Sequence, residues 1–399
     1  MRVLMVCISD PGDGKKGDTK LVRNRQITLE RMGCTIDILY FEWGLFKSSI
    51  KIKNGVGREG VDIVAQIGAR RIVVWLLSKG RELKGKPIQT WLSFALAGSW
   101  GGRLGTIFSS YTTIHFFHIR SVGLWKLAPE KTRVIADLID SYTLNIGNWI
   151  KIEKRWWAKL LLREEYKKMY SMELGIEDYV RNTFKSTVAT VATPDLEHIG
   201  GSTIRKVVIP VGIEIKSLAR RTEECSGIEC IFFGNLDYRP NIDACHVIID
   251  VARELRVRRR DSSIRITVAG RNISRGLKSM LSRQGVTVIS PVENMYDLVK
   301  SKDVAILPMV SGSGMQSKIL EAISWGVLVM ATHRTATPLK LIRDEDYIEV
   351  ETAGDIVERL LDVANGRFEM DTIRRKAHKR IGVFGWEKTC ERLIEEYAR

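Results

Sequence analysis

Two series of apolar, β-branched runs alternate with segments of helical periodicity along this chain. The first series extends from a strand predicted at residues 3–8 to one at 206–210, and the second from 229–233 to 327–330. Between them, IPVGI (209–213) indicates a linker, because proline cannot donate to a strand ladder and glycine adopts unusual dihedrals. The alternation is typical of βα units around parallel sheets. We therefore predict an α/β chain of two tandem, Rossmann-like, doubly wound domains, residues 1–210 and 211–385, with ligands bound at carboxyl ends of strands and in the interdomain cleft.

The individual elements follow from the same pattern. A long helix is predicted from about residue 149 to 179. Further strands are predicted at residues 35–41, 71–76, 113–117, 134–139 and 187–192 in the first domain, and at 265–269, 286–289 and 304–307 in the second.

The chain carries a large and unevenly distributed positive charge. Its 399 residues include 63 Lys and Arg against 47 Asp and Glu, a formal net charge of +16, and basic residues are most in excess over residues 51–133. Such a surplus is typical of proteins that bind nucleic acid, anionic membranes or phosphorylated ligands. No stacking platform or nucleic-acid module is evident, so we expect no nucleic-acid partner and keep an anionic membrane surface as a further partner.

Cysteine usage and hydropathy bear on metal binding and on cellular location. The six cysteines are scattered without metal-ligand spacing, which predicts reduced thiols and no metal site. No apolar run reaches the roughly 20 residues that span a bilayer. We expect a cytoplasmic protein, with peripheral attachment at the inner face of the membrane as the alternative.

Three loops, each placed after a strand and before a helix, contain glycine. Glycine lets the backbone approach a ligand closely, and the N-terminus of the following helix offers free N–H groups to an anion. In the third loop Lys318 and Glu321 share a helix face, which suits a phosphate and a ribose, although a Lys and a Glu at this spacing are more often a surface pair. The three segments are PGDGKKGD (11–18), which also fits a plain surface turn, FFGNLDYRPN (232–241) and SGSGMQSKILEA (311–322).

Polar residues at strand ends of the first domain are the other candidates. His115, His118 and Arg120 lie in or just after one predicted strand, and Asp137 and Asp140 lie at the end of another. Such positions suit an acceptor or sugar site, although a histidine there is often a structural group.

The segment 148–170 combines aromatic and basic residues. Spacing along one continuous helix would put Trp149, Ile152, Trp156 and Leu160 on one face. This pattern fits an interfacial helix at a membrane, or an amphipathic helix packed on its own sheet.

Together these motifs resemble the retaining glycosyltransferases of the GT-B fold, of the family-4 (glycosyl transferases group 1) type, over nearly the whole chain. The resemblance is carried by IFFGNLDYRPNIDA (231–244), VAGRN (268–272), residues 304–308, GSGMQSKILE (312–321), the linker and FGWE (384–387). It implies a C-terminal lobe that binds a nucleotide-sugar, an N-terminal lobe that binds the acceptor, and a last helix, 386–399, that returns to the first lobe.

The resemblance also implies roles for single residues. Glu321 would bond the ribose, Lys318 and the amides near Gly314 the diphosphate, and residues 288–291 the base. The donor-site residues are thus Gly234, Asn235, Gly270, Arg271, Val288, Ile289, Pro291, Ser313, Gly314, Met315, Gln316, Lys318 and Glu321; the catalytic candidates are Lys318, Arg239, Asp137 and His118; and the acceptor or sugar loop comprises Gly14, Gly17, Asp18, His115, Arg120 and Asp140.

Four positions depart from the common family pattern. Ser313 replaces the first Glu of a two-Glu motif, Asn235 replaces Arg, Pro240 replaces Lys with Arg239 one place earlier, and Val211 replaces a linker Asn.

The implied reaction is transfer of a sugar, with retention of configuration, from a nucleoside diphosphate to a glycan or lipid-linked acceptor in cell-surface polysaccharide or glycolipid synthesis. We expect neither a metal nor a cofactor. The alternative is a non-catalytic GT-B scaffold that binds a partner or an anionic polymer.

Overall fold

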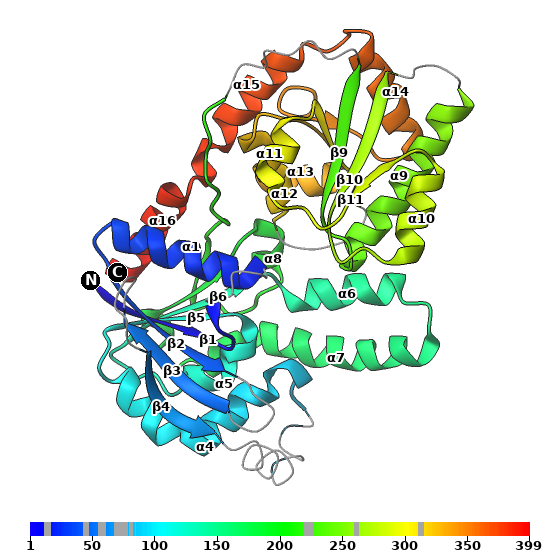
Figure 1. Cartoon of the computed structure of the whole chain (residues 1–399). Helices are drawn as coiled ribbons and strands as arrows, with labels where there is room; N and C mark the ends of the chain where they lie inside the picture. Colours follow the sequence, from blue (N-terminus) through cyan, green and yellow to red (C-terminus); the bar gives the residue numbers. More distant parts are fainter. Residues whose placement is uncertain are drawn as a thin grey trace. The chain divides into compact units, whose positions relative to one another are not determined.

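The chain divides into two compact α/β units (Figure 1). A computed structural model describes residues 1–11, 17–42, 48–54, 61–67, 79, 83, 85–218, 227–258, 263–309 and 315–399. Unit 1 comprises residues 1–212 and 386–399, and unit 2 comprises residues 213–385, against a predicted boundary after residue 210. The predicted fold class, two parallel-sheet α/β domains, is confirmed.

Unit 1 is built on an eight-stranded sheet in the order β4-β3-β2-β1-β5-β6-β7-β8. Six strands are parallel, but β3 and β4 run antiparallel to their neighbours. This differs from the parallel sheet that the βα pattern predicts, and neither strand was predicted. For β3 the reason is that Ile50 and Ile52 are the sole apolar side chains in its sequence. The strand predicted at 71–76 lies outside the described residues. The bounds are β1 (Arg2–Cys7), β2 (Thr35–Glu42), β3 (Ser48–Asn54), β4 (Val61–Ile67), β5 (Thr113–Phe117), β6 (Arg133–Ile139), β7 (Ser186–Thr190) and β8 (Arg205–Val208).

Both faces of this sheet are covered by helices. Along β1, Val3 and Met5 point into one core cluster and Leu4 and Val6 into another, as the two-residue period of a strand requires. The first cluster includes residues of α1 (Gly17–Arg31) and α16 (Trp386–Ala398), and the second residues of α4 (Trp91–Phe108) and α5 (Val122–Trp125). The last helix of the chain is therefore part of the core of unit 1.

The predicted long helix over 149–179 is interrupted. The chain forms a helical hairpin of α6 (Tyr142–Ile152) and α7 (Trp156–Leu174), followed by a 3-10 turn (Ile176–Tyr179). Glu153 and Arg155 at the break adopt extended backbone conformations. The prediction that Trp149 and Trp156 share one helix face is consequently wrong, because they lie on different helices.

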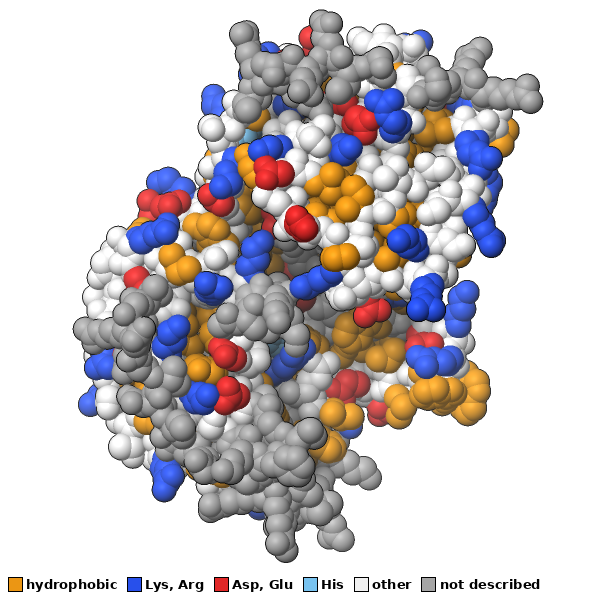
Figure 2. Space-filling model, viewed as in Figure 1, with side chains coloured by type: hydrophobic (Ala, Val, Ile, Leu, Met, Phe, Trp, Pro, Cys, Tyr) orange, Lys and Arg blue, Asp and Glu red, His pale blue; other side chains and the backbone are white. Residues whose placement is uncertain are grey.

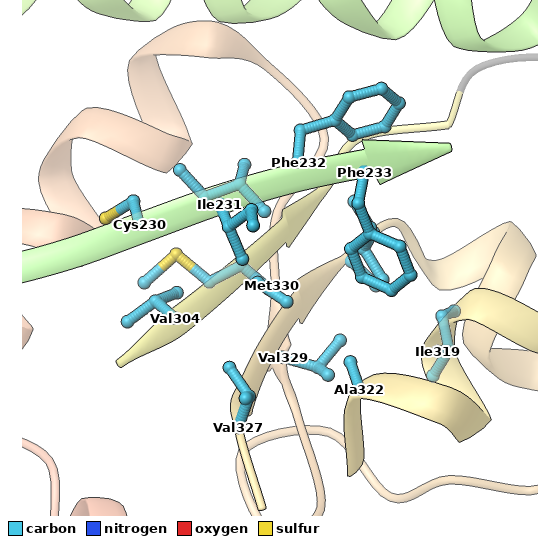
Figure 3. Close-up of a cluster of buried hydrophobic side chains, with 14 of the residues drawn as sticks. Cys230, Ile231, Phe232, Phe233, Val304, Ile319, Ala322, Val327, Val329 and Met330 are labelled. Carbon is cyan, nitrogen blue, oxygen red and sulfur yellow. The ribbon is translucent and has the colours of Figure 1, made fainter. Parts of the chain in front are cut away.

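Unit 2 contains a wholly parallel six-stranded sheet in the order β11-β10-β9-β12-β13-β14. The sixth strand, β14, was not predicted because it has two residues. Side chains of β9, β12 and β13 meet those of α12 in the core (Figure 3). The strands are β9 (Ile228–Asn235), β10 (Ile264–Arg271), β11 (Thr287–Ile289), β12 (Val304–Leu307), β13 (Leu328–Ala331) and β14 (Ile348–Glu349); the helices are α9 (Arg239–Val257), α10 (Arg275–Arg283), α11 (Met295–Lys300), α12 (Ser317–Ser324), α13 (His333–Ala336), α14 (Ala353–Ala364) and α15 (Met370–Arg380).

Each sheet has one point where the strand order reverses. In unit 1 it lies between β1 and β5, and in unit 2 between β9 and β12. Ligands of open parallel sheets bind in the crevice outside the carboxyl ends of the strands at such a point. The topology therefore directs attention to residues just after β1, β5, β9 and β12. None of the helices in the described ranges is both long and apolar enough to cross a bilayer.

Candidate active site

A pocket opens in unit 1 at this switch point. It encloses about 380 Å³ of space, including the volume at its open mouth, and α1 contributes the buried side chain of Thr19. The lining residues follow the carboxyl ends of β1, β5 and β6: Cys7, Ile8, Ser9, Pro11, Thr19, Val22, Phe117, His118, Arg120 and Ile139. Of the predicted first-lobe residues, His118 and Arg120 line this pocket.

Two residues of the pocket wall have strained backbones. His118 has φ 70° and Ile139 has φ 68°, values that are uncommon for non-glycine residues and rare for a β-branched one. Asp137 holds both, since its Oδ1 accepts from Ile139 N at 3.0 Å and its carbonyl accepts from His118 N at 2.6 Å. Strain of this kind persists where the surroundings over-determine it, and it concentrates at functional sites.

Asp137 belongs to a charged network that is closed off from solvent. Its carboxylate pairs with Arg25 of α1, and His115 Nε2 lies 3.4 Å from its Oδ2; all three side chains are fully buried. Arg25 also donates to Ile209 O at 3.2 Å, and His115 Nδ1 lies 2.6 Å from the Tyr397 hydroxyl of α16. Asp137 and His115 therefore support the pocket wall from behind and do not line it.

The pKa values in this network follow from burial and charge. Burial raises the pKa of Asp137, but the adjacent Arg25 charge and the His115 contact outweigh it and lower the pKa to about 2. Burial lowers the pKa of His115. The network at neutral pH is thus an Arg25–Asp137 ion pair beside a neutral imidazole.

His118 is also neutral. Burial, together with the nearby Arg120 charge, lowers its pKa to about 3. The backbone N–H of Arg120 donates to His118 Nδ1 at 3.5 Å, which puts the ring proton on Nε2. The Arg120 guanidinium bonds Tyr142, and Asp140 accepts from Asn145 at 2.6 Å. His118 can accordingly offer one N–H donor to a ligand.

In unit 2, Lys318 of α12 reaches the carboxyl end of β9. Its ammonium donates to Asn241 Oδ1, and Asn241 Nδ2 donates to Asn235 O at 2.6 Å. Gly234 has φ 153°, a conformation that residues with a side chain rarely adopt, and a Cβ there would lie 2.8 Å from Lys318 Nζ, so glycine suits the point where the lysine crosses the strand end. Burial lowers the pKa of Lys318 to about 8, although the charge of Glu321 opposes the shift. This partly buried cation is thus hydrogen-bonded to a neutral amide, with the Glu321 charge nearby, and a bound anion would further stabilise its charged form.

The other donor-site residues lie in or near the strands and helix starts of unit 2. Asn272 Nδ2 donates to Asn235 Oδ1 at 3.2 Å, and a Cβ on Gly270 would clash with Gly234 O. Arg239 begins α9 and pairs with Asp243 at 2.9 Å, so its charge is engaged on its own helix. Arg271 is at the end of β10, Val288 and Ile289 are in β11 with Pro291 just beyond, Met315 packs on the core, and Gln316 precedes α12.

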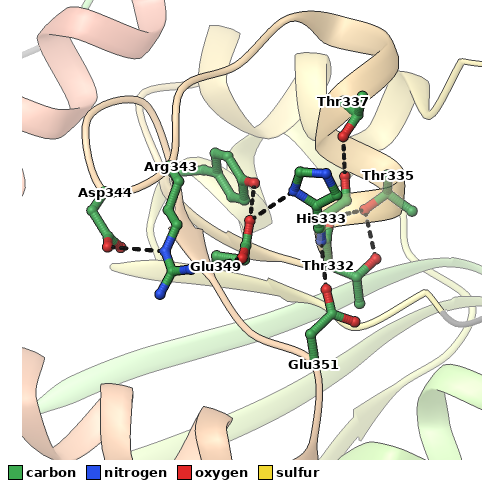
Figure 4. A network of polar contacts seen from close by, with 9 residues as sticks. Thr332, His333, Thr335, Thr337, Arg343, Asp344, Glu349 and Glu351 are labelled. Atoms are coloured by element: carbon green, nitrogen blue, oxygen red, sulfur yellow. Dashed lines mark hydrogen bonds and ion pairs between the residues drawn. The ribbon is translucent and has the colours of Figure 1, made fainter.

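The end of β13 carries a separate polar network (Figure 4). Glu349 accepts from the Tyr347 hydroxyl at 2.7 Å and from Arg343 at 3.1 Å, and His333 Nδ1 lies 3.0 Å away. The Tyr347 hydrogen bond, followed by the His333 and Arg343 contacts, lowers the pKa of Glu349. These groups satisfy one another, which stabilises the connection after β13.

Some predicted residues cannot be placed in this geometry. Gly14, Ser313 and Gly314 lie outside the described residues, and Gly17 and Asp18 are described as the first backbone residues of α1. Within the ranges that the structure describes, no three His, Cys, Asp or Glu side chains gather in a metal-binding group.

Part of the chain matches a known protein family, and the whole chain is similar in fold to solved structures. Residues 227–365 match the model of the family described as glycosyl transferases group 1. Sucrose-phosphate synthase from Thermosynechococcus elongatus is 12% identical to this chain with a TM-score of 0.68. The match covers 100% of this chain and 98% of the synthase chain. Anabaena HepE in complex with UDP and glucose is 12% identical with a TM-score of 0.62, and the match covers 100% of this chain and 99% of the HepE chain. A trehalose-6-phosphate structure from E. coli bound with UDP-2-fluoro glucose is 12% identical with a TM-score of 0.60. This match also covers 100% of this chain and 99% of the other chain.

The resemblance to GT-B glycosyltransferases is confirmed. The matched family model covers most of unit 2, and the GT-B fold extends over the whole chain. No curated protein matches the chain by sequence.

Four residues of this GT-B chain were missed by the sequence reasoning. Arg25, Asn241, Tyr142 and Tyr397 each contact a predicted site residue. Asn241 stood within the motif at 231–244 and could have been selected there. The contact between Tyr397 and His115 spans 282 positions, and no local pattern signals it.

Proposed function

We propose that this protein is a retaining glycosyltransferase that transfers a sugar from a nucleoside diphosphate sugar to a glycan or lipid-linked acceptor, in cell-surface polysaccharide or glycolipid synthesis. The observation that carries the proposal is Lys318, held by Asn241 against Gly234 at the switch point of unit 2. The family match of residues 227–365 and the GT-B fold support the same activity.

The donor would be bound by unit 2. As the bond to the sugar breaks, negative charge develops on the diphosphate, and a cation already in place stabilises that charge without reorganisation. Lys318 supplies the cation, the first turn of α12 supplies N–H groups, and Glu321 one turn further on would accept from the ribose hydroxyls. We propose that this cation makes a divalent metal unnecessary.

The acceptor would be bound by the pocket of unit 1. Neutral His118, with its proton on Nε2, would donate to a substrate oxygen, and Arg120 supplies positive charge at the rim. In a retaining transfer the acceptor attacks on the face from which the diphosphate leaves, and the leaving phosphate oxygen takes the proton of the attacking hydroxyl. The pocket then has to orient and desolvate the acceptor and need not supply a base.

A panel of nucleoside diphosphates and their sugars, measured by thermal shift with and without EDTA, tests the proposal. We expect one base to raise the Tm at millimolar concentration, unaffected by EDTA, and the matching sugar donor to be slowly hydrolysed to the sugar of retained configuration. Lys318→Met serves as the control that should not respond. If no member of the panel raises the Tm, the proposal fails; binding with neither hydrolysis nor transfer would favour the non-catalytic scaffold.

A further inference from the structure

The α6–α7 hairpin ends in a strip of large apolar side chains that are exposed to solvent. Trp156 is 73% exposed, Trp157 49%, Leu160 51% and Leu161 66%. At positions i, i+1, i+4 and i+5 of one helix, these four form a single continuous face. Figure 2, in the same view as Figure 1, shows hydrophobic side chains gathered at this end of α7. We call these four residues the hairpin tip.

The packing of the hairpin does not explain the hairpin tip. The buried side of α7 includes Ala158 and Met169, and the Tyr166 ring lies so near Gly147 of α6 that a Cβ on this glycine would touch it. At its base, Glu173 accepts from Ser141 Oγ at 2.7 Å. The hairpin is therefore fixed through its other face. In the first two turns of α7, the side chains exposed to solvent are ones that a surface helix normally buries.

Basic residues surround the hairpin tip. Lys151, Lys154, Arg155, Lys159 and Arg163 lie within seven positions of it, against a single acidic residue, Glu153, over 149–163. Glu153 is bonded to Arg155 at 2.9 Å, and the Arg155 guanidinium lies 5.0 Å from the Trp157 ring. The next acidic residue, Glu164, pairs with Lys167. The net charge beside the apolar strip is thus positive.

We propose that the hairpin tip binds the surface of an anionic lipid bilayer. Tryptophan rings favour the headgroup region because they combine an apolar body with a polar N–H, and leucines extend below them into the acyl boundary. Lysine and arginine at the same level are attracted to anionic headgroups. The hairpin tip and the basic residues beside it supply both components, which is the composition of an interfacial helix.

A second copy of the chain fits this surface less well. Two hairpin tips in contact would bring ten basic side chains of the two copies together, and like charges across an interface oppose association. The proposal is independent of the proposed function, because bilayer binding is measured with no sugar donor present.

Flotation of the full chain with vesicles of two parts phosphatidylcholine to one part phosphatidylglycerol tests the proposal. We expect binding that the replacements Trp156→Ser, Trp157→Ser, Leu160→Ser and Leu161→Ser together weaken by more than roughly 100-fold. Lys154→Gln, Lys159→Gln and Arg163→Gln together should weaken it on the order of 100-fold, at about fivefold per charge, and have little effect on pure phosphatidylcholine.

A matched control uses apolar residues that are just as exposed elsewhere. Phe184 is 86% and Val257 is 76% exposed, and Phe184→Ser with Val257→Ser should bind vesicles like the wild type. Equal loss in this control, absence of wild-type binding, or a concentration-dependent dimer abolished by the tip variant would overturn the proposal.

A second measurement does not depend on the folding of the serine variant. Brominated phosphatidylcholine in the same vesicles should quench tryptophan fluorescence of the wild type. Trp156→Phe with Trp157→Phe should still bind and lose most of the quenching, because these two rings enter the bilayer. Unchanged quenching in the phenylalanine variant would place the contact elsewhere and refute the assignment.

Discussion

Asp137 of unit 1 and Lys318 of unit 2 both lie close to a point where the strand order of a parallel sheet reverses, but their partners differ. Asp137 is fully buried and ion-paired with Arg25, with His115 and Tyr397 completing the network. Lys318 is partly buried and bonds the neutral amide of Asn241. A charge with a charged partner contributes to holding the fold, whereas a charge with a neutral partner is poised to bind a ligand.

The largest expected effect comes from breaking the network of unit 1. Asp137→Asn leaves Arg25 as an unpaired buried charge, and we expect the free energy of unfolding to fall by about 3–5 kcal/mol. Chemical denaturation measures the loss. Asp140→Asn, at the same strand end but hydrogen-bonded to neutral Asn145, is the matched control and should cost about 1 kcal/mol. Equal losses would mean that Arg25 is not the partner that matters.

The same pair predicts the acid response of the fold. The folded pKa of Asp137 is about 2 against an ordinary value of 3.8, so its stabilising contribution is complete above about pH 4 and disappears as the pH falls through about 2. Denaturation curves of the wild type should show this loss, and Asp137→Asn should show a smaller one between those values.

The next largest effect concerns the ligand. Lys318→Met should weaken nucleoside diphosphate binding roughly 100-fold, because a partly buried cation bonded to phosphate contributes strongly. Isothermal titration of UDP and GDP measures it. Unlike Asp137→Asn, this variant should be no less stable than the wild type; a large loss of stability would assign Lys318 a structural role.

The pKa of Lys318 predicts how stability and nucleotide affinity depend on pH. Its folded pKa of about 8 lies below the ordinary 10.5, so the unfolded chain binds the extra proton between these values and stability contributed by this group rises with pH across them. Nucleotide affinity should change in the opposite direction, falling as the pH rises through about 8. The affinity change should be absent in Lys318→Met.

A smaller effect is expected one helical turn away. Glu321→Ala removes the proposed acceptor of the ribose hydroxyls and should weaken nucleotide binding roughly tenfold while free diphosphate binds as before. The control Glu345→Ala removes a carboxylate from an exposed ion pair with Lys376 and should leave affinity unchanged. Unchanged nucleotide affinity in Glu321→Ala would remove this residue from the site.

The smallest effect sharpens the role of α16. Tyr397→Phe deletes the hydroxyl that contacts His115 and should cost about 1 kcal/mol, a Tm lower by about 2–4 °C, with nucleotide affinity unchanged. Calorimetry of the wild type and of Tyr397→Phe checks the difference in Tm. A shift in nucleotide affinity without a change in Tm would contradict the structural role assigned to Tyr397.

Local patterns were sufficient for much of this architecture. The strands predicted at 113–117 and 304–307 agree with β5 and β12 at both ends, because buried parallel strands are continuous apolar runs. Glycine before a helix start likewise marked Gly234, whose φ of 153° explains why residues with a side chain do not suit that position. Helix α6–α7 was predicted as one element because helical periodicity continues through Glu153–Arg155, and nothing in the composition of that segment signals the break.

The sequence by itself determined two α/β units, their approximate strand positions, and a set of polar residues at strand ends, since all of these depend on neighbours a few positions apart. The tertiary structure alone divided those polar residues, assigning His118 to a pocket wall and His115 and Asp137 to a buried support. That division depends on Arg25 and Tyr397, whose contacts cross 112 and 282 positions of chain. Burial and charge pairing are properties of the folded surroundings, and they decide whether an ionisable side chain stabilises the fold or is free to act on a ligand.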